Sequence, residues 1–265
     1  MLPLIIKNLE LVKEKNPFVY NLSNLIAMNF VINGLLSLGA SYRASSIEFE
    51  VEEIIKASSS VVLNTGMINH KNQGLYAKIA DVANKLGKPL ILDPSGADLT
   101  SHHRGLVHQL LISHKFDIVR GNTHEIMAIS GEPTFKAEDK KEKHAQAALL
   151  MGQALSHRHD MCVVVSGKED VIIVKEHHRI FDYGHTLMPR ISGIGCLLSS
   201  VLGAFHAVDK DPLSAASSGI VIYGMAGELA AKKSTIQGPG TFQSGFLDML
   251  HNLSQKDLEE HYRHG

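Results

Sequence analysis

The sequence contains the stretch Pro89-Leu90-Ile91-Leu92-Asp93-Pro94-Ser95-Gly96, in which a short aliphatic run ends at an acidic residue, a proline and a glycine. Consecutive aliphatic residues without polar alternation predict a strand that is buried on both faces of a sheet. Proline and glycine directly after the run predict that the chain turns there. The stretch therefore indicates a central strand of a parallel sheet, with Asp93 at its carboxyl end.

Outward from this stretch, similar aliphatic runs alternate with longer segments in which apolar residues recur every three or four positions. This alternation of strands and helices favours an α/β fold, with a mostly parallel sheet and helices on both of its faces. Beyond residue 165 the pattern predicts an antiparallel hairpin at a sheet edge and then three apolar helices. The expected strands are residues 19–22, 60–63, 89–92, 117–119, 161–165, 171–174 and 179–183, and the three closing helices are residues 193–208, 212–233 and 242–253.

The length and composition predict a single domain. A chain of 265 residues with 44% apolar residues has ample material for one large core. Internal repeats and Pro/Gly/Ser-rich linkers are absent from the sequence, and its polar run at residues 136–143 is short enough to be a surface loop. We therefore expect residues 1–265 to form one unit.

Charge and cysteine usage exclude several classes of protein. The 26 basic and 27 acidic residues leave a formal charge of -1, which disfavours nucleic acid as a partner. The most apolar segment, residues 194–208, is shorter than the roughly 20 residues that span a bilayer, so we expect no membrane partner. Two cysteines cannot form a disulfide framework, and the charged first 15 residues do not resemble a signal peptide. A cytoplasmic location is expected.

Polar residues and glycines follow each of the central aliphatic runs. In an open α/β sheet, ligands bind beyond the carboxyl ends of the strands, so these residues predict the site. Asp93 and Glu125 could hold Mg²⁺ beside phosphate oxygens, directly or through water, although each could instead be a capping or salt-bridged carboxylate. Arg120 could pair with a phosphate or could be a packed structural arginine.

A glycine-rich segment, Ser192-Gly193-Ile194-Gly195-Cys196, directly precedes an apolar helix. Glycines at a helix start let backbone N–H groups turn toward an anion, and the helix dipole adds partial positive charge. The segment therefore predicts an anion hole for a phosphoryl group, and it matches neither a Walker A loop nor the dinucleotide fingerprint. In the first helical turn, Cys196 could have enhanced acidity and accept a proton, or it could be a small buried residue, as we expect of Cys162.

The 16 histidines do not predict a metal site. The pairs His102-His103 and His177-His178 and the neighbours His157 and His159 fall in polar segments without Cys or carboxylate residues at ligand spacing. Adjacent side chains on a helix or strand also point in different directions. These histidines are expected to be solvated surface residues.

A set of short motifs occurs in a fixed order over residues 18–250. They are Asn21-Leu22-Ser23-Asn24, Asn33-Gly34, Asn64-Thr65-Gly66, Asp93-Pro94-Ser95-Gly96, Arg120-Gly121-Asn122, Ser192-Gly193-Ile194-Gly195-Cys196 and Gly238-Pro239-Gly240-Thr241. Together they closely resemble the hydroxyethylthiazole kinase family of thiamine salvage. The resemblance implies a ribokinase-like three-layer sandwich that phosphorylates the primary alcohol of 4-methyl-5-(2-hydroxyethyl)thiazole.

The resemblance also implies ATP as co-substrate, Mg²⁺ as the metal and a homotrimer with its sites at subunit boundaries. Carried over residue by residue, it implies that Cys196 is the catalytic base. The other implied roles are the anion hole at Gly193, Ile194, Gly195 and Cys196, ATP contacts at Arg120 and Ser166, substrate contacts at Ala44, Gly66 and Gly193, and metal-associated acids at Asp93 and Glu125.

The segment Ser41-Tyr42-Arg43-Ala44-Ser45 departs from the family, which usually has Ser-Pro-Val-Met-Ala there. Ala44 stands in place of a methionine that touches the thiazole in the family. Two alternatives therefore remain open: a kinase of the same fold that acts on a hydroxymethylpyrimidine or pyridoxal type of alcohol, and a non-catalytic relative that binds nucleotide or thiazole.

Overall fold

A sheet of 8 strands forms the centre of the computed structural model, which describes residues 1–43, 45–131, 141–233 and 235–263, and the side chains of all these except 141–146. The strands are β1 (Phe18–Leu22), β2 (Ser41–Arg43), β3 (Ser60–Asn64), β4 (Leu90–Asp93), β5 (Ile118–Asn122), β6 (Cys162–Ser166), β7 (Asp170–Val174) and β8 (His177–Phe181). They are arranged in the order β2-β1-β3-β4-β5-β6-β7-β8.

The pairing of the strands confirms the predicted α/β sheet. All pairs from β2 to β6 are parallel, whereas β6, β7 and β8 pair antiparallel and form the expected hairpin at one edge. At the other edge lies β2, which the sequence did not predict because three residues are too few to show a period. The carboxyl ends of the six parallel strands therefore meet along one edge of the sheet.

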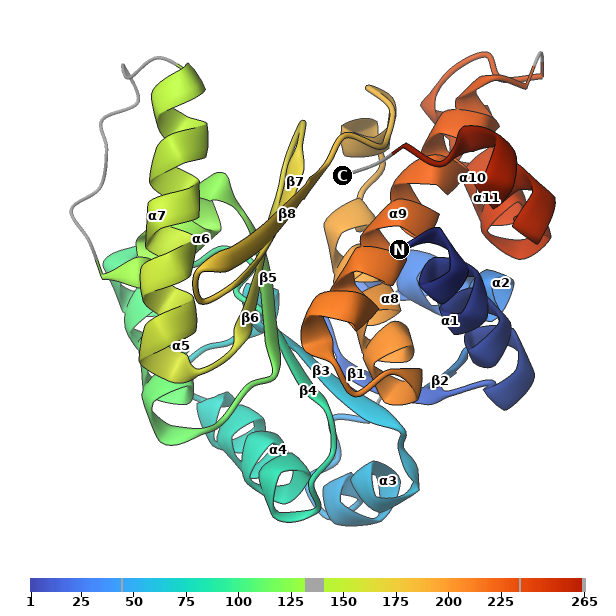
Figure 1. The fold of residues 1–265 in the computed structure, drawn as a ribbon. Coiled ribbons are helices and arrows are strands. Elements are labelled where there is room, and N and C mark those ends of the chain that lie inside the picture. Colours follow the sequence, from blue (N-terminus) through green and yellow to red (C-terminus); the bar gives the residue numbers. More distant parts are fainter. Residues whose placement is uncertain (44, 132–140, 234, 264–265) are drawn as a thin grey trace.

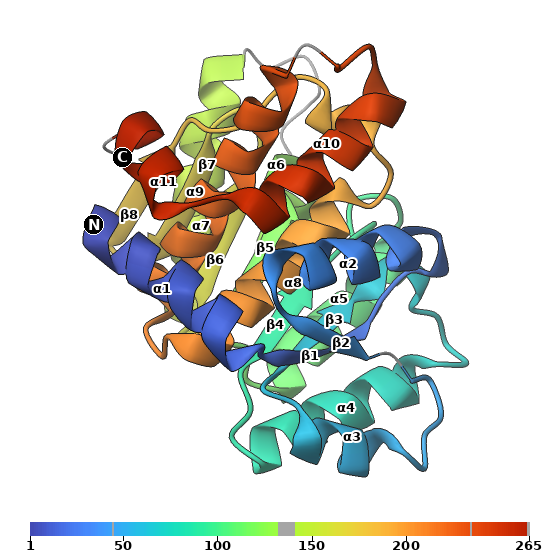
Figure 2. The same cartoon turned by 90° about the vertical axis from the view of Figure 1, so that its right-hand side faces the viewer.

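Helices cover both faces of the sheet (Figure 1). One face carries the helices from the two ends of the chain, and the other face carries the helices from its middle, as the turned view also shows (Figure 2). On the first face are α1 (Leu2–Lys15), α2 (Leu25–Leu38), α8 (Ile194–Val208), α9 (Pro212–Ala231) and α10 (Pro239–Asn252), with α11 (Gln255–His261) against α1. On the second are α3 (Val51–Ala57), α4 (Gln73–Lys85), α5 (Ser101–Ser113), α6 (Thr123–Ser130) and α7 (Lys141–His159).

The alternation of side chains along the strands divides the core into two layers. In β4, Ile91 packs with the first group of helices, whereas Leu90 and Leu92 pack with the second. All three are fully buried, which is why the aliphatic run lacks the polar alternation of a half-exposed strand. The prediction of both-face burial is confirmed.

The closing helices differ in detail from the prediction. The helix expected at residues 242–253 begins earlier, at Pro239, because proline is favoured in the first helical turn, where its missing N–H costs no hydrogen bond. A fourth helix, α11, follows and is capped by Ser254, whose hydroxyl accepts from the Asp257 N–H group.

Among the described residues, no helix is both long and apolar enough to cross a membrane.

Candidate active site

The strand ends predicted to form the site do lie together. Asn64, Asp93, Asn122 and Ser166 are the last residues of β3, β4, β5 and β6, and Asn64 pairs with Asp93 while Asn122 pairs with Ser166. The strand expected at residues 117–119 continues further as β5, because Arg120 pairs with Val164 and Gly121 with Val165 of β6. The strand therefore holds the Arg120 backbone rigidly.

The predicted anion hole lies at the start of α8. Gly193 precedes the helix with a φ of 86°, a left-handed conformation that favours glycine. The Ile194 N–H group contacts the Ile191 carbonyl at 3.4 Å, and the helical hydrogen bonds begin with Leu197 N–H to Gly193 O at 2.9 Å. Of the predicted donors, Gly195 and Cys196 in the first turn are therefore the two best placed to meet an anion.

Arg120 lies against this helix start. A Cβ atom at Gly195 would come within 2.7 Å of Arg120 Nη1, so the glycine lets the guanidinium reach the first turn. Arg120 Nη2 donates to Ser166 Oγ, and Ser166 in turn donates to the Gly121 carbonyl at 3.3 Å. The two residues predicted to contact ATP are thus joined to each other beside the anion hole.

Asp93 and Glu125 are neighbouring buried acids. Asp93 Oδ2 accepts from Ser199 Oγ at 2.9 Å and lies 4.0 Å from Arg120 Nη1, and burial raises its pKa despite these partners. Burial, and then the Asp93 charge, raise the pKa of Glu125 to about 7. The Glu125 carboxylate also closes a capping box by accepting from Asn122 N–H at 2.8 Å, so it caps α6, and its association with a metal stays a prediction.

Two carboxylates that oppose each other's ionisation suit a divalent cation, which would balance their charges. Within the described ranges, no group of three or more His, Cys, Asp or Glu side chains is arranged to hold a metal. A Mg²⁺ ion at Asp93 and Glu125 would therefore take its remaining ligands from water and phosphate oxygens, which is its usual coordination. The residues present fit such an ion.

Cys196 has the predicted position but not the predicted acidity. It is the third residue of α8, and Asn64 Nδ2 donates to its Sγ atom at 3.3 Å. Burial and the charge of Asp93 raise the pKa of Cys196 to about 12, and the opposing effects of Arg120 and Asn64 are smaller. The expected enhanced acidity is therefore not found, because burial and Asp93 disfavour the thiolate more than Arg120 and Asn64 favour it. Cys162 is buried in β6, where burial raises its pKa further.

The predicted substrate residues are only partly described. Ala44 lies outside the described residues. A Cβ atom at Gly66 would stand 3.3 Å from Ser95 Oγ and 3.6 Å from Asn24 Nδ2, so this glycine keeps open a space between polar side chains. A Cβ atom at Gly193 would stand 3.0 Å from the Ala27 Cβ atom, so this glycine lets the start of α8 approach Ala27 closely.

Several residues of the site were given no individual role by the sequence analysis. Asn64 Oδ1 accepts from the Gly66 N–H group, and Asn64 Nδ2 donates to Cys196 Sγ. Tyr223 donates to the Ile194 carbonyl at 2.6 Å. The position of Asn64 at a strand end was a usable signal, whereas Tyr223 lies inside an apolar helix with no local signal. His103 was expected on the solvated surface, but it is half-buried and lies 3.5 Å from Thr65 Oγ1.

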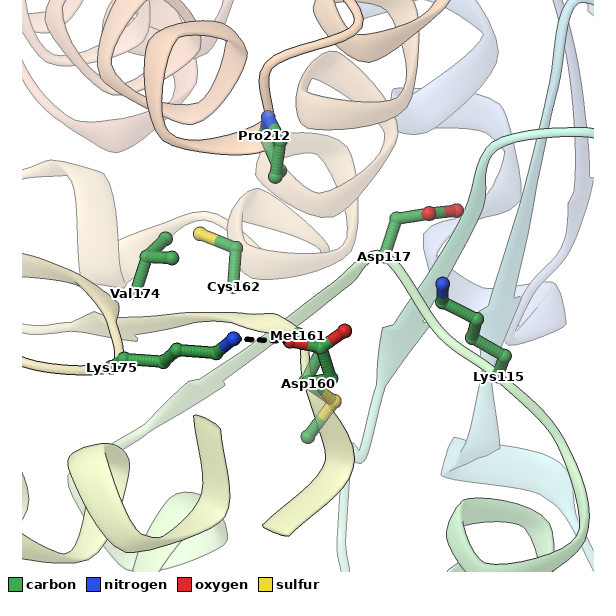
Figure 3. Close-up of a pocket in the computed structure, with 8 residues that line it drawn as sticks. All are labelled: Lys115, Asp117, Asp160, Met161, Cys162, Val174, Lys175 and Pro212. Atoms are coloured by element: carbon green, nitrogen blue, oxygen red, sulfur yellow. Dashed lines mark ion pairs between the residues drawn. The ribbon is translucent and has the colours of Figure 1, made fainter. Parts of the chain in front are cut away.

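A separate pocket of about 250 Å³ lies at the opposite edge of the sheet (Figure 3). Its lining includes Asp117 and Met161, which precede β5 and β6, so it faces the amino ends of these strands. Lys175 and Asp160 form an ion pair of 2.7 Å across it. None of the predicted site residues lines this pocket.

Comparison with known proteins first defines the class. The fold matches a ribokinase-like superfamily protein from Enterococcus faecalis with a TM-score of 0.66 and 14% identity, over 92% of this chain and 89% of that one. This likeness shows a ribokinase-like fold, whose sheet has the start of α8, an arginine and two acids at its carboxyl edge.

A narrower match gives the family. Residues 9–256 match the model of the hydroxyethylthiazole kinase family, and the chain belongs to this family. It is 34% identical to a hydroxyethylthiazole kinase of Desulfotalea psychrophila over 96% of this chain and 92% of that protein. A hydroxyethylthiazole kinase structure from Pyrococcus horikoshii superposes with a TM-score of 0.89 and 31% identity, covering 98% of both chains.

Proposed function

We propose that this protein transfers the γ-phosphoryl group of ATP to the primary alcohol of 4-methyl-5-(2-hydroxyethyl)thiazole. The observation that carries the proposal is the position of Arg120, which lies against the first turn of α8, is bonded to Ser166 and is 4.0 Å from Asp93. A fixed cation beside backbone N–H donors and a pair of acids is an arrangement for binding phosphate and its metal. Membership of the family supports the choice of alcohol.

The chain contributes mainly position and charge to the reaction. The Gly195 and Cys196 N–H groups and the Arg120 guanidinium bind the phosphate oxygens, on which negative charge accumulates during transfer. The substrate hydroxyl enters beside Gly66 and Gly193 and attacks in line. Cys196 lies next to this path and accepts the hydroxyl proton in its thiolate form, which Asn64 Nδ2 stabilises by donating to the sulfur atom.

Asp93 and Glu125 are the residues that would hold Mg²⁺, together with water. When bound, the ion would neutralise phosphate charge and the charges of the two acids. Ser199 and the backbone N–H groups of Gly96 and Asn122 hold the carboxylates toward this position. The role of Ala44 in substrate binding stays a prediction from the resemblance.

A homotrimer is supported by a cluster of exposed apolar side chains. They follow the carboxyl ends of the adjacent strands β1, β2 and β3, at the same edge as the site, and Phe49 is 95% exposed. An apolar surface of this kind is typical of an interface. The cluster consists of Leu25, Ile26, Ile47, Phe49 and Met67.

Both cysteines are free thiols, which supports the proposed cytoplasmic location.

The proposed reaction can be tested by an ATP-consumption screen with the purified protein. The acceptors are the thiazole alcohol, a hydroxymethylpyrimidine and pyridoxal, and mass spectrometry identifies the phosphate ester. We expect the highest kcat/KM for the thiazole alcohol. A higher value for either of the other alcohols would favour the changed-substrate alternative. Binding of ATP or thiazole without turnover of any acceptor would favour the non-catalytic alternative.

A further inference from the structure

His103 contacts the loop of residues 93–96. This loop begins at Asp93, and its Gly96 N–H group donates a hydrogen bond to Glu125. His103 is the third residue of α5, and its neighbour His102 is exposed. The His103 Cε1 and Nε2 atoms lie 3.5 Å and 3.7 Å from the position of a Cβ atom at Gly96, so the ring packs directly on this glycine. The Nε2 atom also lies 3.5 Å from Thr65 Oγ1.

The hydrogen bonds of Thr65 determine the direction of its contact with His103. The buried Thr65 hydroxyl faces the carbonyl oxygens of Asp93 and Ser95 at 3.3 Å and 3.2 Å. Carbonyl oxygens only accept, so the single hydroxyl proton points to them, and Thr65 Oγ1 is the acceptor toward the ring. A ring nitrogen that faces an acceptor donates, so this contact assigns the proton of the ring to Nε2. Burial lowers the pKa of His103.

Both residues that the ring contacts are linked to the loop of residues 93–96. Thr65 fixes the loop at the carbonyls of Asp93 and Ser95. Gly96, with a φ of 82°, turns its N–H group to Glu125 Oε1 at 3.3 Å. The His103 ring therefore packs on Gly96, the residue of this loop whose N–H group binds Glu125.

We propose that His103 is a positioning residue for phosphoryl transfer, which holds the loop of residues 93–96 so that Asp93 and Glu125 keep their places at the site. The ring donates to Thr65 and packs on Gly96, and through these two residues it acts on the loop. A displaced loop would move both carboxylates together, and misplaced catalytic groups lower the rate of the chemical step. This inference rests on the proposed function for its kinetic consequence but not for its structural one.

The inference is tested with the variants His103→Ala and His103→Gln, and with His102→Ala as the matched control. Hydrogen–deuterium exchange measures the protection of the peptide that contains Gly96, without ATP, metal or acceptor. We expect His103→Ala to increase the exchange rate of this peptide about 10-fold and to lower kcat about 10-fold, as loss of a supporting contact does in other sites. The side-chain amide of glutamine retains a donor, so His103→Gln should recover most of both quantities, and His102→Ala should change neither.

Unchanged exchange in His103→Ala would overturn the inference. Equal losses in His103→Ala and His103→Gln, accompanied by the same fall in Tm, would also overturn it, because they would show a packing role without a directed hydrogen bond. Failure of the proposed function is a different result: the wild-type protein would not phosphorylate the thiazole alcohol, while the exchange measurement would still decide the role of His103.

Discussion

Arg120 connects the charged groups of the proposed site. Its guanidinium meets Ser166, Asp93 and the first turn of α8, although these lie on three separate segments of the chain. Its charge lowers the pKa values of Asp93, Glu125 and Cys196, but burial raises all three by more. Burial therefore disfavours the charged form of each of these three groups.

Cys196→Ala tests the role of the thiol. A positioned proton acceptor contributes roughly 10²- to 10⁴-fold to the rate, and the raised pKa of Cys196 places the expected loss of kcat at the lower end, about 10²-fold. Steady-state kinetics with the thiazole alcohol measure the loss, and KM for ATP should change little. Cys162→Ala is the control, because Cys162 is buried in β6 away from the site. Wild-type kcat in Cys196→Ala would refute the assignment.

Asp93→Asn tests the metal site. Removal of one charge should raise the Mg²⁺ concentration for half-maximal activity about 10-fold and lower kcat. The pKa of Asp93 is raised by burial, so the neutral side chain should not lower Tm. A Mg²⁺ titration and a thermal melt measure the two effects. An unchanged titration would place the metal elsewhere.

Asp170 predicts a pH dependence of stability. Its carboxyl accepts from Gly167 N–H, but burial raises its pKa from 3.8 to about 6. Because the folded pKa exceeds the unfolded one, protonation favours the folded state, and this contribution is lost as the pH rises from about 4 to 6. Asp170→Asn removes the effect, so it should unfold with a free energy higher than wild type by about 1 to 3 kcal/mol at pH 8 and equal to it at pH 4.

Urea unfolding at the two pH values measures this difference. Asp248→Asn, at an exposed position of α10, is the control and should show no pH-dependent difference. A constant difference between Asp170→Asn and wild type from pH 4 to pH 8 would contradict the prediction.

At the scale of elements, α8 links the core to the site. Its apolar face packs on β3 and β4, and its first turn lies at their carboxyl ends. Ser199 and Ser200 lie one turn beyond Cys196 on the same helix. Ser199 donates a hydrogen bond to Asp93, and Ser200 accepts one from Asn21. The packing of one helix thus places both the anion hole and the partners of a buried acid.

Gly193→Ala tests the start of α8. A Cβ atom at Gly193 would require a strained φ of 86° and would stand 3.0 Å from Ala27 Cβ. We expect a loss of about 1 to 3 kcal/mol in the free energy of unfolding and a higher KM for ATP. Gly105→Ala is the matched control, since nothing lies within 4 Å of its Cβ position in α5, and it should gain about 0.5 to 1 kcal/mol. Equal stabilities of the two variants would contradict this account.

At the scale of the whole molecule, the order of the strands creates the site. Segments that are 132 residues apart meet where Asn64 contacts Cys196, and segments 106 apart meet where Ser199 contacts Asp93. The pocket in Figure 3 lies at the opposite edge and is not part of this arrangement.

Phe49→Lys tests the proposed homotrimer. A charge in the exposed apolar cluster should be desolvated in the interface, so the variant should dissociate. Sedimentation velocity should show wild type at three times the chain mass of 28.9 kDa and the variant at a lower mass. Ile112→Lys, at another exposed apolar position, should stay trimeric. A monomeric wild type would contradict the proposal.

The sequence by itself determined the fold class, because burial of a strand on both faces leaves a local pattern in runs such as Leu90-Ile91-Leu92. It also located Asp93, Arg120, Ser166 and the start of α8, since polar residues and glycines at strand ends and helix starts are visible in any sequence. The tertiary structure alone decided which groups these residues form hydrogen bonds with and in which direction their pKa values shift. The pKa of Cys196 follows from burial and from Asp93, and the place of His103 follows from Thr65 and Gly96. Such effects depend on groups far apart along the chain, and no local pattern encodes them.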